Sequence, residues 1–251
     1  MDRHEDIATA RGGSPPRAGW RARLRDRLRD RLRDRFGLRA AAPLIPKLVV
    51  GLLCFGLGIG LMVESGLGLG PWEALNQGIA RQVGLEIGTV SVLLGIPILL
   101  LWWPLGERPG IGTLLNVVLI GTSTNVTIAI VPTPPADALA LRVALMAIGI
   151  VAIGCGSGIY LSTDLGAGPR DGLMTGLHHR FGWSIRRART VVELTVLGIG
   201  WALGGTVGLG TVVFAVGIGP LVQVALRVFD RDGRLGRRRR ASLESEGVVG
   251  E

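Results

Sequence analysis

Two carboxylates in matching surroundings are the residues of this sequence with the clearest potential for chemistry. Glu73 and Asp171 each lie two residues after a proline that ends a Gly-x-Gly-Pro tetrapeptide. Proline is favoured at the first helical position, so each acid is predicted to lie in the first turn of a helix. There a carboxylate can cap free backbone N–H groups and oppose the helix dipole. It can equally bind a cation or a proton, and both interpretations remain open.

The glycines before each proline predict a break in the helical chain. They favour a loop followed by a helix whose first N–H groups are free. At membrane depth such backbone occurs only where it is buried in protein or lines a wet cavity. Two such helix starts could form a site for an ion or an anionic group, and the alternative is a tight turn between packed helices. The candidate residues are Gly68, Gly70, Pro71, Glu73, Gly166, Gly168, Pro169 and Asp171.

Three further polar residues lie in strongly apolar stretches. Glu193 is a candidate because an acid inside a membrane span is costly, and the alternative is an ion pair with Arg189 one turn earlier. Asn125 and Gln223 lie at equivalent places late in two apolar segments. They are candidates for contact with a solute, and hydrogen bonding between helices is the alternative.

The segments that must position these residues form an internal sequence repeat. The segment 66–75 returns as 164–173, and Gly112-Thr113 returns at the same spacing of 98 residues as Gly210-Thr211. Tandem apolar copies with a Gly-Pro break in each are typical of polytopic membrane proteins. The sequence therefore predicts two homologous membrane repeats, one of which supplies Glu73 and the other Asp171.

Composition predicts an all-α, polytopic transmembrane fold. The mean hydropathy is +0.44, and charged residues gather at the chain ends and in a few short segments. A span needs about 20 apolar residues, so a segment of 13 residues is too short to cross by itself. We predict three spans and one short half-helix per repeat, six spans in all, or eight if the half-helices cross. The predicted spans are 44–63, 87–105, 111–131, 139–161, 191–203 and 209–228, and the half-helices are 71–83 and 169–181.

Four regions follow from this pattern. Residues 1–42 are predicted to be a basic cytoplasmic arm, 43–138 the first repeat, 139–230 the second, and 231–251 a basic and then acidic tail. In the arm an apolar residue recurs every fourth position among arginines, which suits a helix lying on an anionic lipid surface. The alternative is a solvated charged tail. The candidate lipid contacts are Arg23, Leu24, Leu28, Leu32 and Phe36.

The distribution of arginine predicts the orientation. The net charge of +9 is concentrated in the arm, the segment around 180–189 and the tail. Because basic loops stay inside, we expect both termini in the cytoplasm and a multi-pass protein of the bacterial inner (cytoplasmic) membrane. The six-span and eight-span alternatives place these basic segments on the same side, so charge does not separate them.

Several functional classes find no support in the sequence. No nucleophile-base constellation, P-loop or H-E-x-x-H motif is present, so we expect no enzymatic activity and no cofactor. His178 and His179 are adjacent and do not share a helix face, and Cys54 and Cys155 lie in apolar runs, so no metal site is predicted. The positive charge belongs to the predicted membrane tether, so no nucleic-acid partner is expected.

The doubled Gly-x-Gly-Pro-x-[Glu/Asp]-x-Leu motif and the Gly-x-Gly-Thr motifs resemble the YczE/YyaS/YitT family of bacterial integral membrane proteins, and the YczE branch most closely. The resemblance covers about residues 43–228 and implies a membrane location and this architecture, without a molecular activity or an active site. We expect a small-solute transporter or permease with its site between the repeats. The alternative is a non-transporting accessory or scaffold protein that binds lipid or a partner protein. Solute, coupling ion and oligomeric state are left unassigned.

Overall fold

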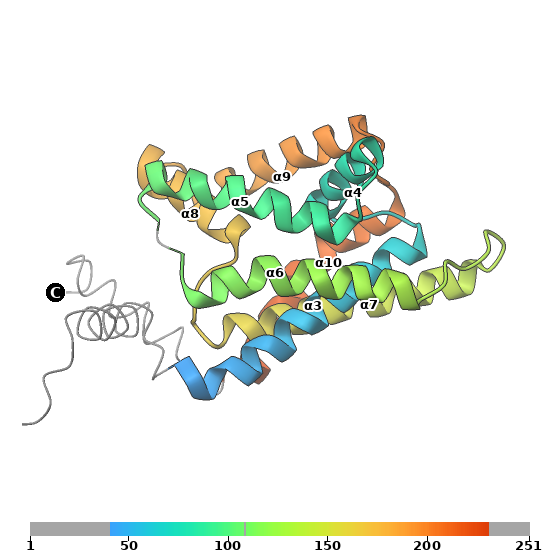
Figure 1. Cartoon of the computed structure of the whole chain (residues 1–251), viewed down its shortest axis with the longest axis horizontal. Coiled ribbons are helices and arrows are strands. Elements are labelled where there is room, and N and C mark those ends of the chain that lie inside the picture. The colour runs from blue at the N-terminus through green and yellow to red at the C-terminus, as the bar shows by residue number, and fades with distance from the viewer. Residues whose placement is uncertain (1–40, 108, 231–251) are drawn as a thin grey trace, which may run out of the picture. The chain divides into compact units, whose positions relative to one another are not determined.

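The computed structural model describes residues 41–107 and 109–230. Within them the chain forms eight α-helices and one short 3-10 turn, η1 (Ala42–Leu44), and no strand (Figure 1). The predicted lipid contacts of the arm and the predicted tail lie outside the described residues. The helices are α3 (Ile45–Ser65), α4 (Pro71–Val83), α5 (Ile87–Leu105), α6 (Ile111–Ile130), α7 (Leu139–Leu161), α8 (Pro169–Phe181), α9 (Ile185–Ala202) and α10 (Leu209–Phe229).

The two short helices predicted at 71–83 and 169–181 are present with these boundaries, and the same residue types set both. Pro71 and Pro169 occupy the first helical position of α4 and α8, where the missing N–H costs nothing. Both helices end at a glycine in the left-handed region, Gly84 with φ 69° and Gly182 with φ 68°. Glycine adopts this conformation without strain and stops the helix.

Five helices are long and apolar enough to cross a membrane: α3 together with η1, and α5, α6, α7 and α10. Many of their large apolar side chains are exposed, as expected for a surface in contact with lipid. The predicted span at 191–203 belongs to a longer helix, α9. The Ser184 hydroxyl accepts a hydrogen bond from the Arg187 backbone N–H and starts this helix at Ile185. The additional residues at the start of α9 include three arginines. Because of this charge, α9 is not among the five helices that are apolar enough to span a membrane.

Helices α3 and α7 pack side by side (Figure 1). Gly51, early in α3, faces Gly156, late in α7, and Gly58 faces Gly149, so the two helices run antiparallel. Small residues permit this close approach. α6 packs on α3 and α10 on α7, while α4 packs against α9 and α5 against α8. The buried core between them is formed by Leu48, Leu52, Ile59, Met62, Leu69, Ala74, Ile120, Met146, Ile150, Ile153, Tyr160 and Ile218.

A matched pair of glycine substitutions tests the α3–α7 contact. Gly58→Ala adds a methyl group 2.6 Å from the Gly149 carbonyl oxygen, whereas Gly217→Ala on α10 enters open space. Overpacking of this kind costs about 1–3 kcal/mol. We expect Gly58→Ala to lower the melting temperature of the purified protein in detergent. Gly217→Ala should leave it unchanged or raise it, because alanine favours a helix. Equal melting temperatures for the two variants would contradict the close contact.

Candidate functional site

The loop before each half-helix docks on the start of a helix from the other half of the chain. The Leu67 carbonyl, before α4, accepts a hydrogen bond of 2.8 Å from the backbone N–H of Gly210 in α10. The Leu165 carbonyl, before α8, accepts one of 3.0 Å from Gly112 in α6. The two contacts are equivalent at the spacing of 98 residues. Each Gly-x-Gly-Pro loop therefore has a Gly-x-Gly-Thr motif as its partner.

A threonine side chain makes hydrogen bonds at each of these two loop contacts. The Thr113 hydroxyl donates to the Ala167 carbonyl at 2.7 Å and accepts from the Gly110 backbone N–H at 3.2 Å. Thr211 accepts from the Gly208 N–H in the same way. A Cβ atom at Gly166 would lie 2.7 Å from the Thr113 hydroxyl oxygen, and φ at this glycine is 136°. Only glycine satisfies both the backbone angle and the close approach, which explains one of the doubled glycines.

The half-helix starts and parts of all eight helices surround one cavity of about 270 Å³. Pro71 and Glu73 of α4 line it, and so do Gly168, Pro169 and Asp171 at the start of α8. Gly68, Gly70 and Gly166 do not line it and belong to the docked loops. The Trp102 indole N–H of α5 donates to the Pro169 carbonyl at 3.0 Å and holds the start of α8 in place. The predicted meeting of the two breaks is therefore seen in the geometry.

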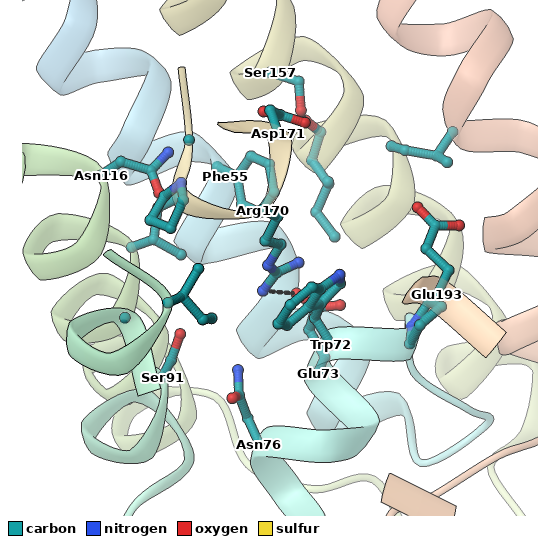
Figure 2. A pocket seen from close by; sticks show the side chains of 18 of the residues that line it. Phe55, Trp72, Glu73, Asn76, Ser91, Asn116, Ser157, Arg170, Asp171 and Glu193 are labelled. Atoms are coloured by element: carbon teal, nitrogen blue, oxygen red, sulfur yellow. Dashed lines mark hydrogen bonds and ion pairs between the residues drawn. The ribbon is translucent and has the colours of Figure 1, made fainter. Parts of the chain in front are cut away.

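Glu73 is buried and forms an ion pair with Arg170, the residue that precedes the other acid. Arg170 Nη2 lies 2.6 Å from Glu73 Oε1 (Figure 2). The contact is an ion pair whose geometry does not meet the criteria for a hydrogen bond. The guanidinium carbon of Arg170 also lies 5.2 Å from the centre of the Trp72 ring. Trp72 and Arg170 occupy equivalent positions of the doubled motif. Their contact links the two half-helix starts.

Asp171 has a different environment from Glu73. The Tyr160 hydroxyl donates to Asp171 Oδ2 at 3.2 Å, and the carboxylate lies beside Gly168 at the helix start, where an added Cβ atom would be 3.2 Å from Oδ2. Asp171 is exposed, and it lines the cavity. In the described part of the chain no basic side chain forms an ion pair with it. The two predicted acids therefore both reach the cavity, one paired and one unpaired.

Glu193 lines the cavity from α9 and also makes the predicted ion pair within its helix. Arg189 Nε lies 2.9 Å from Glu193 Oε1, and Arg189 lines the cavity beside it. The two interpretations of Glu193 are thus compatible in this geometry.

The amides Asn125 and Gln223 lie outside the cavity. Asn125 joins α6 to α5, because its amide donates to Glu86 Oε2 at 2.6 Å and accepts from the Gly88 backbone N–H at 2.7 Å. This is the interhelical hydrogen bonding that was the alternative to solute contact. Gln223 is exposed on α10.

Two other amides, Asn76 of α4 and Asn116 of α6, line the cavity instead. Their exposed fractions are 4% and 9%, so both are more than nine-tenths buried. Figure 2 shows both directed toward the space around Arg170. Neither makes a side-chain hydrogen bond within residues 41–107 and 109–230, and their amide atoms are accessible from the cavity. Their free donors and acceptors are available to a bound molecule.

Comparison with known proteins places the chain in a family. The family model described as "Family of unknown function (DUF6198)" matches residues 45–227. The chain belongs to this family. An uncharacterized protein of Haemophilus influenzae is 46% identical over 187 residues, which cover 74% of this chain and 85% of the relative. No solved structure matches the chain.

Two Bacillus subtilis relatives agree with the resemblance seen in the motifs. The uncharacterized membrane protein YczE is 35% identical over 179 residues, covering 70% of this chain and 82% of its own. The uncharacterized protein YyaS is 29% identical over 184 residues, covering 72% and 92%. Together with the apolar helices, these relatives identify this DUF6198 chain as an integral membrane protein.

Several cavity residues of this DUF6198 chain were not predicted from its sequence. They are Trp72, Asn76, Asn116, Tyr160 and Arg170. One signal was available, since the doubled motif has tryptophan in one copy and arginine in the other. Asn116 and Tyr160 were visible only as isolated polar groups in apolar runs. Their convergence depends on packing between distant helices.

Removing one hydroxyl tests the docked loop in this family member. Thr113→Val abolishes the part-buried bond to the Ala167 carbonyl and the bond from the Gly110 N–H, and a hydrogen bond of this kind contributes about 0.5–1.5 kcal/mol. Thr122→Val is the matched control, because the Thr122 hydroxyl bonds only within its own helix and is exposed. We expect thermal unfolding in detergent to occur at lower temperature for Thr113→Val than for Thr122→Val. The opposite order would contradict the docking.

Proposed function

We propose that this protein is a non-enzymatic transporter or permease for a small solute, which binds in the central cavity between two membrane repeats. The observation that carries the proposal is the convergence of both half-helix starts on one buried cavity. That cavity also holds an unpaired carboxylate and two unpartnered amides. Secondary transporters place their sites between repeats at such interrupted helices.

A two-fold relation between residues 43–138 and 139–230 supports the proposal. For a contact between the halves, adding 98 to the residue of the first half and subtracting 98 from the residue of the second gives another contact, as with the two docked loops. The Gly51–Gly156 contact likewise corresponds to the Gly58–Gly149 contact. The Cys54 thiol contacts the carbonyl of its own equivalent, Ala152, at 3.4 Å. Antiparallel packing of equivalent helices is the arrangement expected of inverted-topology repeats.

The same geometry favours six spans with half-helices that do not cross. In a six-span chain α3 and α7 point in opposite directions, as they do here, whereas eight spans would make them parallel. Arg81 at the end of α4 bonds to the Gly204 carbonyl, and His179 at the end of α8 lies 3.1 Å from Glu107. An eight-span arrangement would separate both pairs across the membrane. We therefore propose α9 as the sixth span and cytoplasmic termini in the bacterial inner membrane.

Cysteine labelling in intact cells tests this topology. In a background without Cys54 and Cys155, single cysteines replace Gln82, Pro134, Glu107 and His179. We expect a membrane-impermeant maleimide to label positions 82 and 134 from outside, and positions 107 and 179 only after the cells are opened. Labelling at 107 alone in intact cells would support eight spans and contradict the inverted repeats.

Transport is tested with the full chain in proteoliposomes. Vesicles are incubated in a defined mixture of amino acids, amines, sugars and organic acids, and their contents are measured by mass spectrometry. We expect at least one solute to accumulate above protein-free vesicles, and the double variant Glu73→Gln/Asp171→Asn to lose most of this accumulation. Glu86→Gln, which removes an acid outside the cavity, should retain it.

An equal solute content in protein-containing and empty vesicles, with the protein still folded, would contradict the transporter proposal. The accessory or scaffold role, in which the basic arm contacts lipid or a partner protein, is then the remaining proposal. Loss of the cellular phenotype on deletion of residues 1–38 would support that role.

A further inference from the structure

The charges and contacts of the cavity indicate a class of solute, and this inference rests on the proposed function. We propose that the solute is a small organic cation whose ammonium group binds at the Asp171 carboxylate, beside the packed rings of Tyr160 and Phe55. The helix starts alone do not decide whether the ligand is an anion or a cation. The other residues of the cavity favour a cation.

The charge of the cavity is negative after its internal pairs are counted. The described residues that line it include the acids Glu73, Asp171 and Glu193 and the bases Arg170 and Arg189. Glu73 pairs with Arg170, and Glu193 pairs with Arg189. Asp171 remains as the one acid of this set without an ion-pair partner, although the charges of Arg170 and Arg189 also act on it. A cation bound at this carboxylate would form the ion pair that it lacks and would balance the net charge of the lining.

The helix starts do not provide a free anion site here, because the acids of the chain already occupy them. Asp171 turns back toward the start of α8, where a Cβ atom at Gly168 would lie 3.2 Å from Asp171 Oδ2. Glu73 turns back toward the start of α4, where a Cβ atom at Gly70 would lie 2.5 Å from Glu73 Oε2. An anionic solute would have to displace these carboxylates and would meet their negative charge. Arg170 is engaged by Glu73 and by the Trp72 ring.

The surroundings of Asp171 suit an ammonium group. The rings of Tyr160 and Phe55 pack edge to face with centroids 6.3 Å apart, and both residues line the cavity. Aromatic rings beside a carboxylate attract an organic cation through their π-electrons. The Ser157 hydroxyl donates to the Ile153 carbonyl, so its oxygen remains an acceptor facing the same space (Figure 2).

The unpartnered amides are independent evidence for a bound organic molecule. Asn76 and Asn116 can donate to and accept from polar groups on the remainder of the solute. The Trp72 indole N–H is also buried without a partner. The cavity of about 270 Å³ lies at the lower end of the size range of small-molecule sites, which suits a small organic molecule.

Binding to the purified full-length protein tests the assignment with a matched pair of probes. Choline carries a quaternary ammonium, and its carbon isostere has nearly the same shape without the charge. Ethanolamine adds a primary amine, and glycolate is the anionic comparison. A wider panel of amines, up to arginine in size, extends the series. Affinity is measured from the rise in melting temperature with probe concentration.

We expect at least one ammonium probe to bind, and the carbon isostere and glycolate to bind much more weakly. Asp171→Asn should weaken ammonium binding about tenfold or more, because it removes a charge-assisted contact. Glu107→Gln, which removes an acid outside the cavity, should leave the affinity unchanged. A melting transition in the absence of probe establishes that each variant is folded.

Three results would overturn the inference: equal binding of choline and its isostere, preferred binding of glycolate, or no binding of any amine in the panel. Transport of an anionic or neutral solute would leave the proposed function standing and remove only the ammonium assignment. Conversely, binding of an ammonium probe without accumulation in vesicles would support the cation site and contradict transport.

Discussion

The constraint on which this structure depends is the need to satisfy the backbone groups of the two Gly-x-Gly-Pro loops that interrupt the helical chain. Water is absent from the hydrocarbon core, so a loop there needs protein partners for its N–H and C=O groups. The loops before α4 and α8 find them on the start of a helix from the other half. Each break is therefore stable only while the two halves are packed together.

This docking also determines what the cavity contains. It brings equivalent positions of the two half-helices together, where Trp72 and Arg170 differ although their surrounding motifs match. Arg170 neutralises Glu73, and no second arginine is present at position 72 to neutralise Asp171. A single difference between the two motifs thus leaves Asp171 without an ion-pair partner in the described residues, whereas Glu73 has one.

Much of the fold could be predicted because its signals are local. Proline and glycine define the ends of α4 and α8, and apolar runs define most of the long helices. The start of α9 was missed, since the Ser184 cap extends this helix into a charged segment. The roles of Asn125 and Asn116 could not be separated by sequence. Both are amides of the same helix, α6. Only the packing of the neighbouring helices places Asn116 at the cavity and Asn125 in a hydrogen bond with the start of α5.

A double-mutant cycle on Glu73 and Arg170 tests most directly whether the two half-helix starts meet. Glu73→Gln, Arg170→Gln and the double variant are compared with wild type by the free energy of unfolding in mixed micelles. The contact at 2.6 Å predicts that the two substitutions are not additive, with a coupling of about 0.5–3 kcal/mol. Additive effects within about 0.3 kcal/mol, the behaviour of distant sites, would contradict the shared cavity.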